Sequence, residues 1–316
     1  MKDLLELFET TPLLRVDCPA CDSPGGTVAV VRNGFSFVLC ANCSSFFVNP
    51  RPAEKSLSEM YAAFPELAAG RAIVTVSDSL REHREAVYRL RCLFEVASSG
   101  RLLDIGCGTG EFLRIAGGHF DVTGIDIAPR VSPQNERIPT VKGNARTLPF
   151  GTAKFEIVTA FEVLEHLAET QNFLDEVHRV LDDRGVFIVQ TGDADTLLAR
   201  INPQRWRYLM PPVHLNAFSR KALYAQLRKT GFEFLKAWSF GQAPSRTPLV
   251  SRLSNPEALR PVFDYAARVG LLGQMYAFRR ASYKSKALET PQSRYRVRTS
   301  RPRVEGRGIH RGTRAE

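Results

Sequence analysis

Arg101-Leu102-Leu103-Asp104-Ile105 leads directly into Gly106-Cys107-Gly108-Thr109-Gly110, and Glu111-Phe112-Leu113-Arg114-Ile115-Ala116 follows. The apolar first stretch predicts a short strand, and the last stretch predicts the start of a helix. Glycines between the two let the backbone approach a ligand closely and open the N-terminus of the helix toward it. The segment therefore predicts a nucleotide-type turn, which alone is weak evidence for any one ligand.

Three neighbouring features narrow the ligand class. A second predicted strand ends in Asp126, sixteen residues after Gly110, where an acid can hold two ribose hydroxyls. The turn has no G-x-x-x-x-G-K-[ST] pattern and no basic residue to meet phosphates. Asp104, just before the first glycine, favours a cationic ligand over a pyrophosphate. A ligand with an adenosyl ribose and a positive centre is S-adenosylmethionine.

The ordered motifs resemble those of class I S-adenosylmethionine-dependent methyltransferases, over roughly residues 100–240. The resembling stretches are Leu103–Gly110, Val122–Asp126, the adenine-contact segment Gly143–Phe150, the fourth strand and its exit Phe155–His166, and Arg179–Val189. That resemblance implies a doubly wound Rossmann-like α/β sheet of seven strands, with the ligand beyond the carboxyl ends of the strands.

The resemblance also implies roles for single residues. Gly106, Gly108 and Gly110 would shape the turn against the methionine part, and Asp104 would lie near the methionine amine. Asp126 would accept hydrogen bonds from both ribose hydroxyls. Asn144 stands where Asp is usual, and its carbonyl can still accept from the adenine amino group. The remaining cofactor contacts implied are Cys107, Ile127, Ala145 and Phe161.

Other elements follow from periodicity and breakers. We expect helices over 78–98, 167–181, 219–230 and 256–269, strands over 155–160, 185–190, 232–240 and from Gln274, and a long loop over 191–217. Four domains are expected: a zinc ribbon over 1–60, a helical cover over 61–99, the methyltransferase domain over 100–283 and a basic disordered tail over 284–316.

Four cysteines form two C-x2-C pairs, Cys18/Cys21 and Cys40/Cys43, with eighteen residues between Cys21 and Cys40. This is the spacing of a four-thiolate zinc site, which leaves no open position for chemistry. Between the pairs, apolar runs flank Asn33-Gly34, a strong hairpin signal. The segment predicts a structural zinc ribbon. Two disulfides or unrelated core cysteines are the alternatives, and a reducing compartment disfavours disulfides.

The ribbon followed by Asn49-Pro50-Arg51-Pro52 and Tyr61 further resembles a subgroup that occurs among sugar C-methyltransferases and other tailoring enzymes. In that subgroup a histidine before a Phe-Ser pair can be the base, and His214 matches this position. A loop-anchoring hydrogen bond is the alternative for His214. His166, beside Glu162 and Glu165, is a second catalytic candidate or a helix-start residue that packs near the cofactor. Trp206 and Tyr208 could line the acceptor pocket or pack the loop.

The charge is uneven. Of the formal net charge of +10, residues 284–316 carry +7, from ten Lys and Arg against three Glu. A tail of this composition is typical of disorder, and either aids solubility or touches RNA, an acidic partner or a membrane surface. No apolar run approaches the ~18 residues of a membrane span, and the N-terminus lacks signal-peptide features, so a cytoplasmic protein is expected.

The leading functional hypothesis is methyl transfer to a small-molecule acceptor, a hydroxyl or carbon acid of a biosynthetic intermediate, sugar-linked ones included. The alternative is an RNA methyltransferase that uses the ribbon and the tail to bind nucleic acid. Only one basic residue, Arg32, lies in the ribbon between Asp22 and Val38, too few for a phosphate track. A third hypothesis is a cofactor-binding scaffold without activity. The acceptor and the oligomeric state are not predicted.

Overall fold

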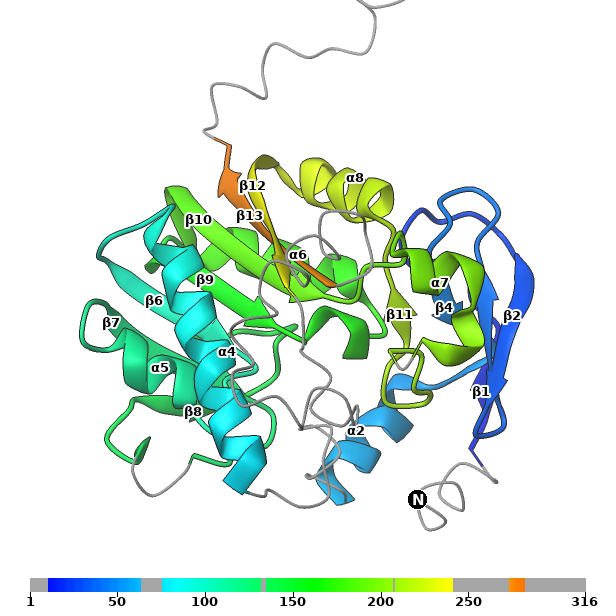
Figure 1. The fold of residues 1–316 in the computed structure, drawn as a ribbon, viewed down its shortest axis with the longest axis horizontal. Coiled ribbons are helices and arrows are strands. Elements are labelled where there is room, and N and C mark those ends of the chain that lie inside the picture. Colours follow the sequence, from blue (N-terminus) through cyan, green and yellow to red (C-terminus); the bar gives the residue numbers. More distant parts are fainter. Residues whose placement is uncertain (1–10, 64–75, 132–134, 207, 241–272, 282–316) are drawn as a thin grey trace, which may run out of the picture. The chain divides into compact units, whose positions relative to one another are not determined.

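Seven strands form the main sheet of the computed structural model, which describes residues 11–63, 76–131, 135–206, 208–240 and 273–281. The chain divides into two compact units, Met1–Ser282 and Tyr283–Glu316, and every described residue belongs to the first. In sheet order the strands are β12 (Phe232–Phe240), β13 (Gly273–Arg280), β10 (Leu181–Thr191), β9 (Phe155–Phe161), β6 (Arg101–Ile105), β7 (Asp121–Asp126) and β8 (Thr140–Lys142) (Figure 1).

The directions and order of the strands indicate at which end of the sheet a ligand would bind. Strands β8, β7, β6, β9 and β10 run parallel, and β13 is antiparallel to both of its neighbours. The chain passes from β6 to β7 and β8 on one side and then crosses to β9 on the other. Ligands of open α/β sheets bind where the order switches in this way, beyond the carboxyl ends of the strands. The predicted doubly wound, Rossmann-like sheet of seven strands is confirmed.

Two helical layers bury the sheet from both sides. Neighbouring strand residues alternate, so that Leu102, Ile157 and Ile188 pack with helices α4 (Val76–Phe94) and α5 (Glu111–Ala116). Leu103, Val158 and Phe187 pack instead with α6 (Thr170–Val180) and α8 (Arg220–Thr230). These helices are labelled in Figure 1. Runs of consecutive apolar residues are what a parallel sheet covered on both faces requires.

The N-terminal part is a small antiparallel sheet. Strands β2 (Thr27–Arg32) and β3 (Phe35–Leu39) form the predicted hairpin, and β4 (Phe46–Val48) pairs with β3. Asn33 and Gly34 both have positive φ, 53° and 78°, as a two-residue hairpin turn with the strands' own twist demands. A short pair, β1 (Leu13–Leu14) with β5 (Arg51–Pro52), precedes helix α2 (Glu54–Ala63).

The segment predicted as a long loop joins the two sheets. It contains α7 (Leu197–Ile201), the 3-10 turn η3 (Pro203–Arg205) and β11 (Asn216–Ala217), and β11 pairs with β4 as the fourth strand of the N-terminal sheet. Ser219 caps α8 by accepting from the N–H of Ala222, and its hydroxyl donates to the carbonyl of Cys43 at 2.6 Å. Trp206 lies 6.0 Å from Phe46, ring centre to ring centre, so it packs this segment on the ribbon.

Several boundaries differ from the sequence expectation. Helix α4 covers 76–94 rather than 78–98, and α6 begins at Thr170 because Leu167 is extended. Strand β10 begins at Leu181, four residues before the expected start at 185. Leu181 already pairs with Phe155 of β9, and the register of the pairing shifts between Leu181 and Val186. The strand expected from Gln274 is confirmed as β13, whereas the expected helix 256–269 and the tail lie outside the described residues. Among the described helices, none combines the length and apolar character of a membrane span.

Candidate functional site

The glycine-rich turn between β6 and α5 has left-handed backbone at each of its three glycines. Their φ angles are 76°, 53° and 79° at Gly106, Gly108 and Gly110, a region that favours residues without Cβ. A Cβ on Gly106 would meet Val163 Cγ2 at 2.5 Å, so this position is also closed by packing. A Cβ on Gly108 would meet nothing within 4 Å. The turn therefore presents open backbone at Gly108 and tight packing beneath it.

Asp126, at the end of β7, binds this turn. Its Oδ2 accepts from the N–H of Gly108 at 2.9 Å and its Oδ1 from the N–H of Ala128 at 2.8 Å. Each carboxylate oxygen has a further lone pair for another donor. Asp126, predicted from the sequence as the ribose-binding acid, thus contacts the glycine turn directly, and acceptor capacity remains on both of its oxygens.

Asp104 lies beneath the turn, 3% exposed, with its Oδ1 accepting from the Thr159 hydroxyl at 2.6 Å. Burial raises the pKa of Asp104 to about 7, although the Thr159 hydrogen bond and the charge of Arg89 act in the opposite direction. The side chain is not in the pocket wall described below. It can act on a bound cation through its charge, and the size of that effect depends on pH near neutrality.

Cys107 and Phe161 support the turn from the side of α4 and α5. Cys107 is buried, and a Cβ on Gly124 would come within 2.8 Å of its Sγ, so the thiol packs directly on β7. The rings of Phe161 and Phe112 meet edge to face, with their centres 5.0 Å apart. The guanidinium of Arg89, on α4, lies 4.5 Å from the centre of the Phe161 ring. Both residues pack behind the turn rather than face the pocket.

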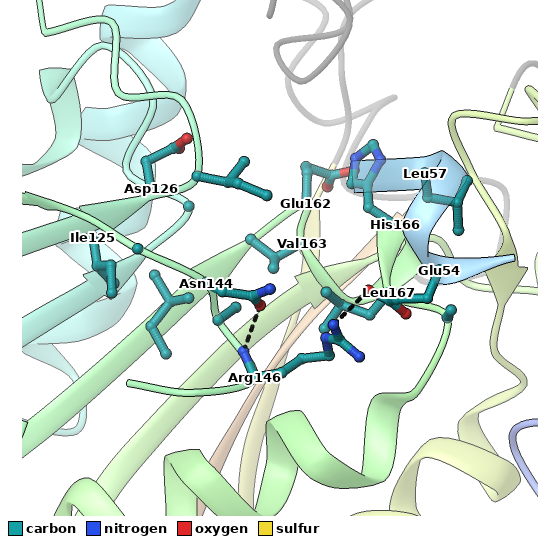
Figure 2. Close-up of a pocket in the computed structure, with 16 residues that line it drawn as sticks. Glu54, Leu57, Ile125, Asp126, Asn144, Arg146, Glu162, Val163, His166 and Leu167 are labelled. Atoms are coloured by element: carbon teal, nitrogen blue, oxygen red, sulfur yellow. Dashed lines mark hydrogen bonds and ion pairs between the residues drawn. The ribbon is translucent and has the colours of Figure 1, made fainter. Parts of the chain in front are cut away.

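A pocket opens at the carboxyl ends of β6, β7 and β9 (Figure 2). Six of the predicted site residues line it: Gly106, Asp126, Ile127, Asn144, Ala145 and His166. The predicted residues Asp104, Cys107, Gly108, Gly110, Phe161 and His214 are absent from its lining. The sequence interpretation did not single out the lining residues Glu54, Leu57, Ile105, Ile125, Gly143, Arg146, Val163, Leu167 and Ala168.

Helix α2, which follows the ribbon, contributes one wall. Arg146 donates to Glu54 at 2.6 Å, as the dashed line in Figure 2 shows, and Leu57 lines the pocket beside it. Asn144 Oδ1 accepts from the N–H of Arg146 at 2.9 Å, which fixes the segment after β8. Burial raises the pKa of Glu54, and the charge of Arg146 opposes this. No periodicity in the sequence links Glu54 to Arg146, because the pair forms only when the ribbon lies against the sheet.

Glu162, just past β9, holds the opposite wall in a left-handed backbone conformation with φ 57°. Such strain costs of order 1–3 kcal/mol in a non-glycine residue and clusters at functional sites. Gln190 Nε2 donates to Glu162 Oε1 at 2.6 Å, and Arg89 Nε donates to Gln190 Oε1 at 3.1 Å. Burial, and then the neighbouring Glu165, raise the pKa of Glu162.

The two candidate histidines lie edge to face, with ring centres 4.8 Å apart. His166, at the end of the 3-10 turn η2 (Leu164–His166), lines the pocket, and Figure 2 shows it next to Glu162. His214 lies behind it, 8% exposed. Burial and then His166 lower the pKa of His214 to about 3, and burial also lowers the pKa of His166. Both imidazoles are therefore neutral at physiological pH.

The four ribbon cysteines converge. Their sulfur atoms lie within 4.8 Å of one another, with Cys18–Cys43 and Cys21–Cys40 both at 3.6 Å. These sulfur–sulfur distances are longer than the about 2.05 Å of a disulfide bond, and none of the four cysteines forms a disulfide. Sulfurs about 2.3 Å from a tetrahedral zinc ion lie about 3.8 Å apart, which fits the observed cluster. Hydrogen bonds with the Cys18 thiol and the Ser45 hydroxyl lower the pKa of Cys43, whereas burial acts to raise it.

A sequence profile of the family described as "Methyltransferase domain" matches residues 80–237, half of the chain. The chain belongs to this family. Its methyltransferase domain contains the sheet from β6 through most of β12, the glycine-rich turn, Asp126 and both histidines.

Individual relatives of the methyltransferase domain act on varied molecules. The chain is 28% identical over 189 residues to 24-methylenesterol C-methyltransferase 2 of Oryza sativa subsp. japonica, a match that covers 52% of this chain and 51% of the relative. It is 32% identical over 100 residues to the ubiquinone biosynthesis O-methyltransferase of Azorhizobium caulinodans, covering 29% and 40%. The chain thus spans about half the length of these curated relatives, or less.

Among solved structures, the fold is similar to that of 1,6-didemethyltoxoflavin-N1-methyltransferase of Burkholderia thailandensis, which contains its acceptor and S-adenosylhomocysteine. The TM-score is 0.50 at 16% identity, over 81% of this chain and all of the other. At this identity the likeness shows the fold alone.

The cysteine cluster predicts one zinc ion per chain, bound by Cys18, Cys21, Cys40 and Cys43. We expect Cys43→Ser to lower the zinc content of the purified protein and its melting temperature, because the change removes one of the four thiolate ligands and metal binding contributes to the stability of the fold. Elemental analysis and thermal melting measure both effects. Cys92→Ser is the matched control, since Cys92 is equally buried but outside the cluster. A stably folded, zinc-free wild-type chain would contradict the prediction.

Proposed function

We propose that the chain transfers the methyl group of S-adenosylmethionine to a small-molecule acceptor, at a hydroxyl or an acidic carbon. The observation that carries the proposal is the pocket itself. Figure 2 shows Asp126 and Asn144 toward one end of it, and Glu54, Leu57, Glu162 and His166 toward the other. One end thus has the residues expected for an adenosine, and the other is a compartment with polar walls for an acceptor.

Several residues of the chain fit the cofactor. Asp126 offers the free lone pairs of two oxygens to the ribose hydroxyls, and Gly108 leaves open space beside it. Ile127 and Ala145 provide apolar contact for the adenine, and Asp104 supplies negative charge behind the methionine end. When bound, S-adenosylmethionine supplies an electrophilic methyl group on a positively charged sulfur.

The chain's part in the reaction is to align the acceptor, exclude water and receive a proton. A bond from the acceptor oxygen or carbon to the methyl group forms as the carbon–sulfur bond breaks, and the acceptor loses its proton. His214 as the base stays a prediction. In the structure it lies behind His166, and a pKa of about 3 makes it a weak proton acceptor near neutral pH. His166 and Glu162 are the groups that face the acceptor compartment.

The contacts of the basic residues in the ribbon and at the pocket favour a small-molecule acceptor over RNA. Arg32, the single basic residue of the hairpin, donates to the carbonyls of Leu209 and Gln204, both at 2.6 Å. Its guanidinium therefore ties the ribbon to the segment before β11 instead of facing phosphates. On the pocket side, Arg146 is paired with Glu54. Phosphate tracks require several exposed, unpaired cations.

The acceptor class is tested with the full-length chain, isotopically labelled S-adenosylmethionine and two acceptor sets: pooled small metabolites with hydroxyl or acidic C–H groups, and total RNA. We expect label in the small-molecule fraction, insensitive to salt between 50 and about 200 mM, a range over which phosphate contacts weaken strongly. Label confined to RNA, with a steep loss on adding salt, would reject the proposal in favour of the RNA methyltransferase hypothesis.

The cofactor site is tested by Asp126→Asn. An amide offers one acceptor oxygen and no charge, so we expect S-adenosylmethionine affinity to fall by about ten-fold or more, as the loss of charged hydrogen bonds of about 1.5–3 kcal/mol implies. Asp121→Asn, at the exposed start of the same strand, is the control and should bind as the wild type does. Isothermal titration calorimetry measures both, and equal affinities for the two variants would remove Asp126 from the ribose site.

The raised pKa of Asp104 predicts pH-dependent cofactor affinity. Above pH 7 the carboxylate is ionised and attracts the cationic ligand, whereas below pH 7 protonation removes this attraction. We therefore expect the affinity of the wild type for S-adenosylmethionine to decrease from pH 8 to pH 6. Asp104→Asn should bind at all pH values about as weakly as the wild type does at pH 6. A pH profile of the variant that parallels the wild type would show that another group is responsible.

A further inference from the structure

Glu165, His166 and His214 form a second cluster of ligand-type side chains in the described part of the chain. One ligand atom from each lies within 4.8 Å of the others. The cluster lies far from the ribbon cysteines in sequence, beside the acceptor end of the pocket, where His166 and Glu162 form the wall. A histidine pair with a carboxylate is a common ligand set for divalent first-row metal ions.

The hydrogen bonds fix the tautomer of both rings. Nδ1 of His166 lies 2.9 Å from the carbonyl oxygen of Val213, and Nδ1 of His214 lies 2.5 Å from that of Tyr208. A carbonyl can only accept, so each Nδ1 carries the proton and each Nε2 of the neutral ring carries a lone pair. Histidine ligands of metals are typically oriented by such a bond from the other ring nitrogen.

Only one of the two carboxylate oxygens of Glu165 accepts a hydrogen bond from the residues that the structure describes. Glu165 is fully buried, and its Oε2 accepts from the Thr191 hydroxyl at 2.9 Å. Its Oε1 has no hydrogen-bond partner among the residues that the structure describes. A buried carboxylate oxygen without a partner is costly, and a bound cation removes that cost. The neighbouring carboxyl of Glu162 interacts with that of Glu165 but lies outside the three-residue cluster, and its Oε1 accepts from Gln190.

The backbone holds the cluster in place. Leu215 N–H donates to the carbonyl of Glu165 at 2.7 Å, and Asn216 Nδ2 donates to that of Leu167 at 2.7 Å. The Tyr208 and Thr191 hydroxyls are hydrogen-bonded to each other at 2.9 Å, which ties the segment before His214 to β10. These contacts preorganise both histidines on Glu165, as a metal site requires.

We infer that Glu165, His166 and His214 bind a divalent metal ion that coordinates the oxygen of the methyl acceptor. The inference deepens the proposed function and rests on it for the acceptor, but metal binding itself can be measured without any acceptor. Because His166 and Glu162 line the pocket, an acceptor hydroxyl or enolate oxygen can reach the ion there. Coordination would make the acceptor hydroxyl more acidic, and its proton would pass to the Glu162 carboxylate, which lines the same pocket, while the histidines serve as ligands and not as the base.

The test uses Mn²⁺ on the full-length, zinc-loaded protein, because Mn²⁺ prefers oxygen and nitrogen ligands and leaves the thiolate site to zinc. Loss of the free Mn²⁺ signal in electron paramagnetic resonance reports binding. We expect one Mn²⁺ per chain, and affinities at least ten-fold weaker in Glu165→Gln and in His166→Ala. His83→Ala is the matched control, since His83 also lies 2.7 Å from a carboxylate, Glu111, but on the surface.

Folding of each variant is checked by S-adenosylmethionine affinity and thermal melting. Absence of Mn²⁺ binding to the wild type overturns the inference, whatever the variants do. Loss of Mn²⁺ binding in His83→Ala, with Glu165→Gln and His166→Ala unchanged, assigns the ion to the surface and overturns it as well. Methyl transfer that proceeds fully in chelator, with zinc retained, also overturns it and leaves the proposed function intact. Mn²⁺ binding at Glu165 and His166 without methyl transfer to any small molecule supports the site and rejects the proposed function.

Discussion

The contact between the Asp126 carboxylate and the N–H of Gly108 joins the two parts on which the site depends. The turn after β6 and the end of β7 are separated in sequence by helix α5, and this 2.9 Å hydrogen bond holds them together. A second bond from Ala128 fixes the other carboxylate oxygen. With both oxygens oriented by the backbone, the carboxylate presents its remaining lone pairs in a defined direction. The positive φ angles of the three glycines are what allow this close approach.

The ribbon is built into the pocket rather than attached beside it. Strand β11 of the methyltransferase domain completes the N-terminal sheet, and Ser219 links the cap of α8 to Cys43. Through α2, the N-terminal part then supplies Glu54 and Leu57 to the pocket wall. Zinc at the four cysteines would therefore stabilise the pocket wall formed by Glu54 and Leu57 at a distance, by holding the sheet from which α2 departs.

Local sequence patterns predicted the parts of the fold that depend on neighbours in the chain. The strands 101–105 and 121–126, the hairpin around Asn33-Gly34 and the helix that ends at Gly231 follow from periodicity and turn residues, and the structure confirms them. Boundaries at 94, 170 and 181 were wrong by a few residues. Pairing partners elsewhere set them, as Phe155 does for Leu181, and a local pattern does not contain that information.

The sequence by itself determined the glycine turn, the acid after the second strand and the two cysteine pairs, because each depends on short spacing and on residue chemistry. Only the tertiary structure decided that His166 faces the pocket while His214 lies behind it, and that Phe161 and Cys107 pack beneath the turn. It also decided that Glu54 meets Arg146. These arrangements arise where segments distant in the chain pack against each other, and packing depends on the shape of the whole sheet edge, which no local spacing encodes.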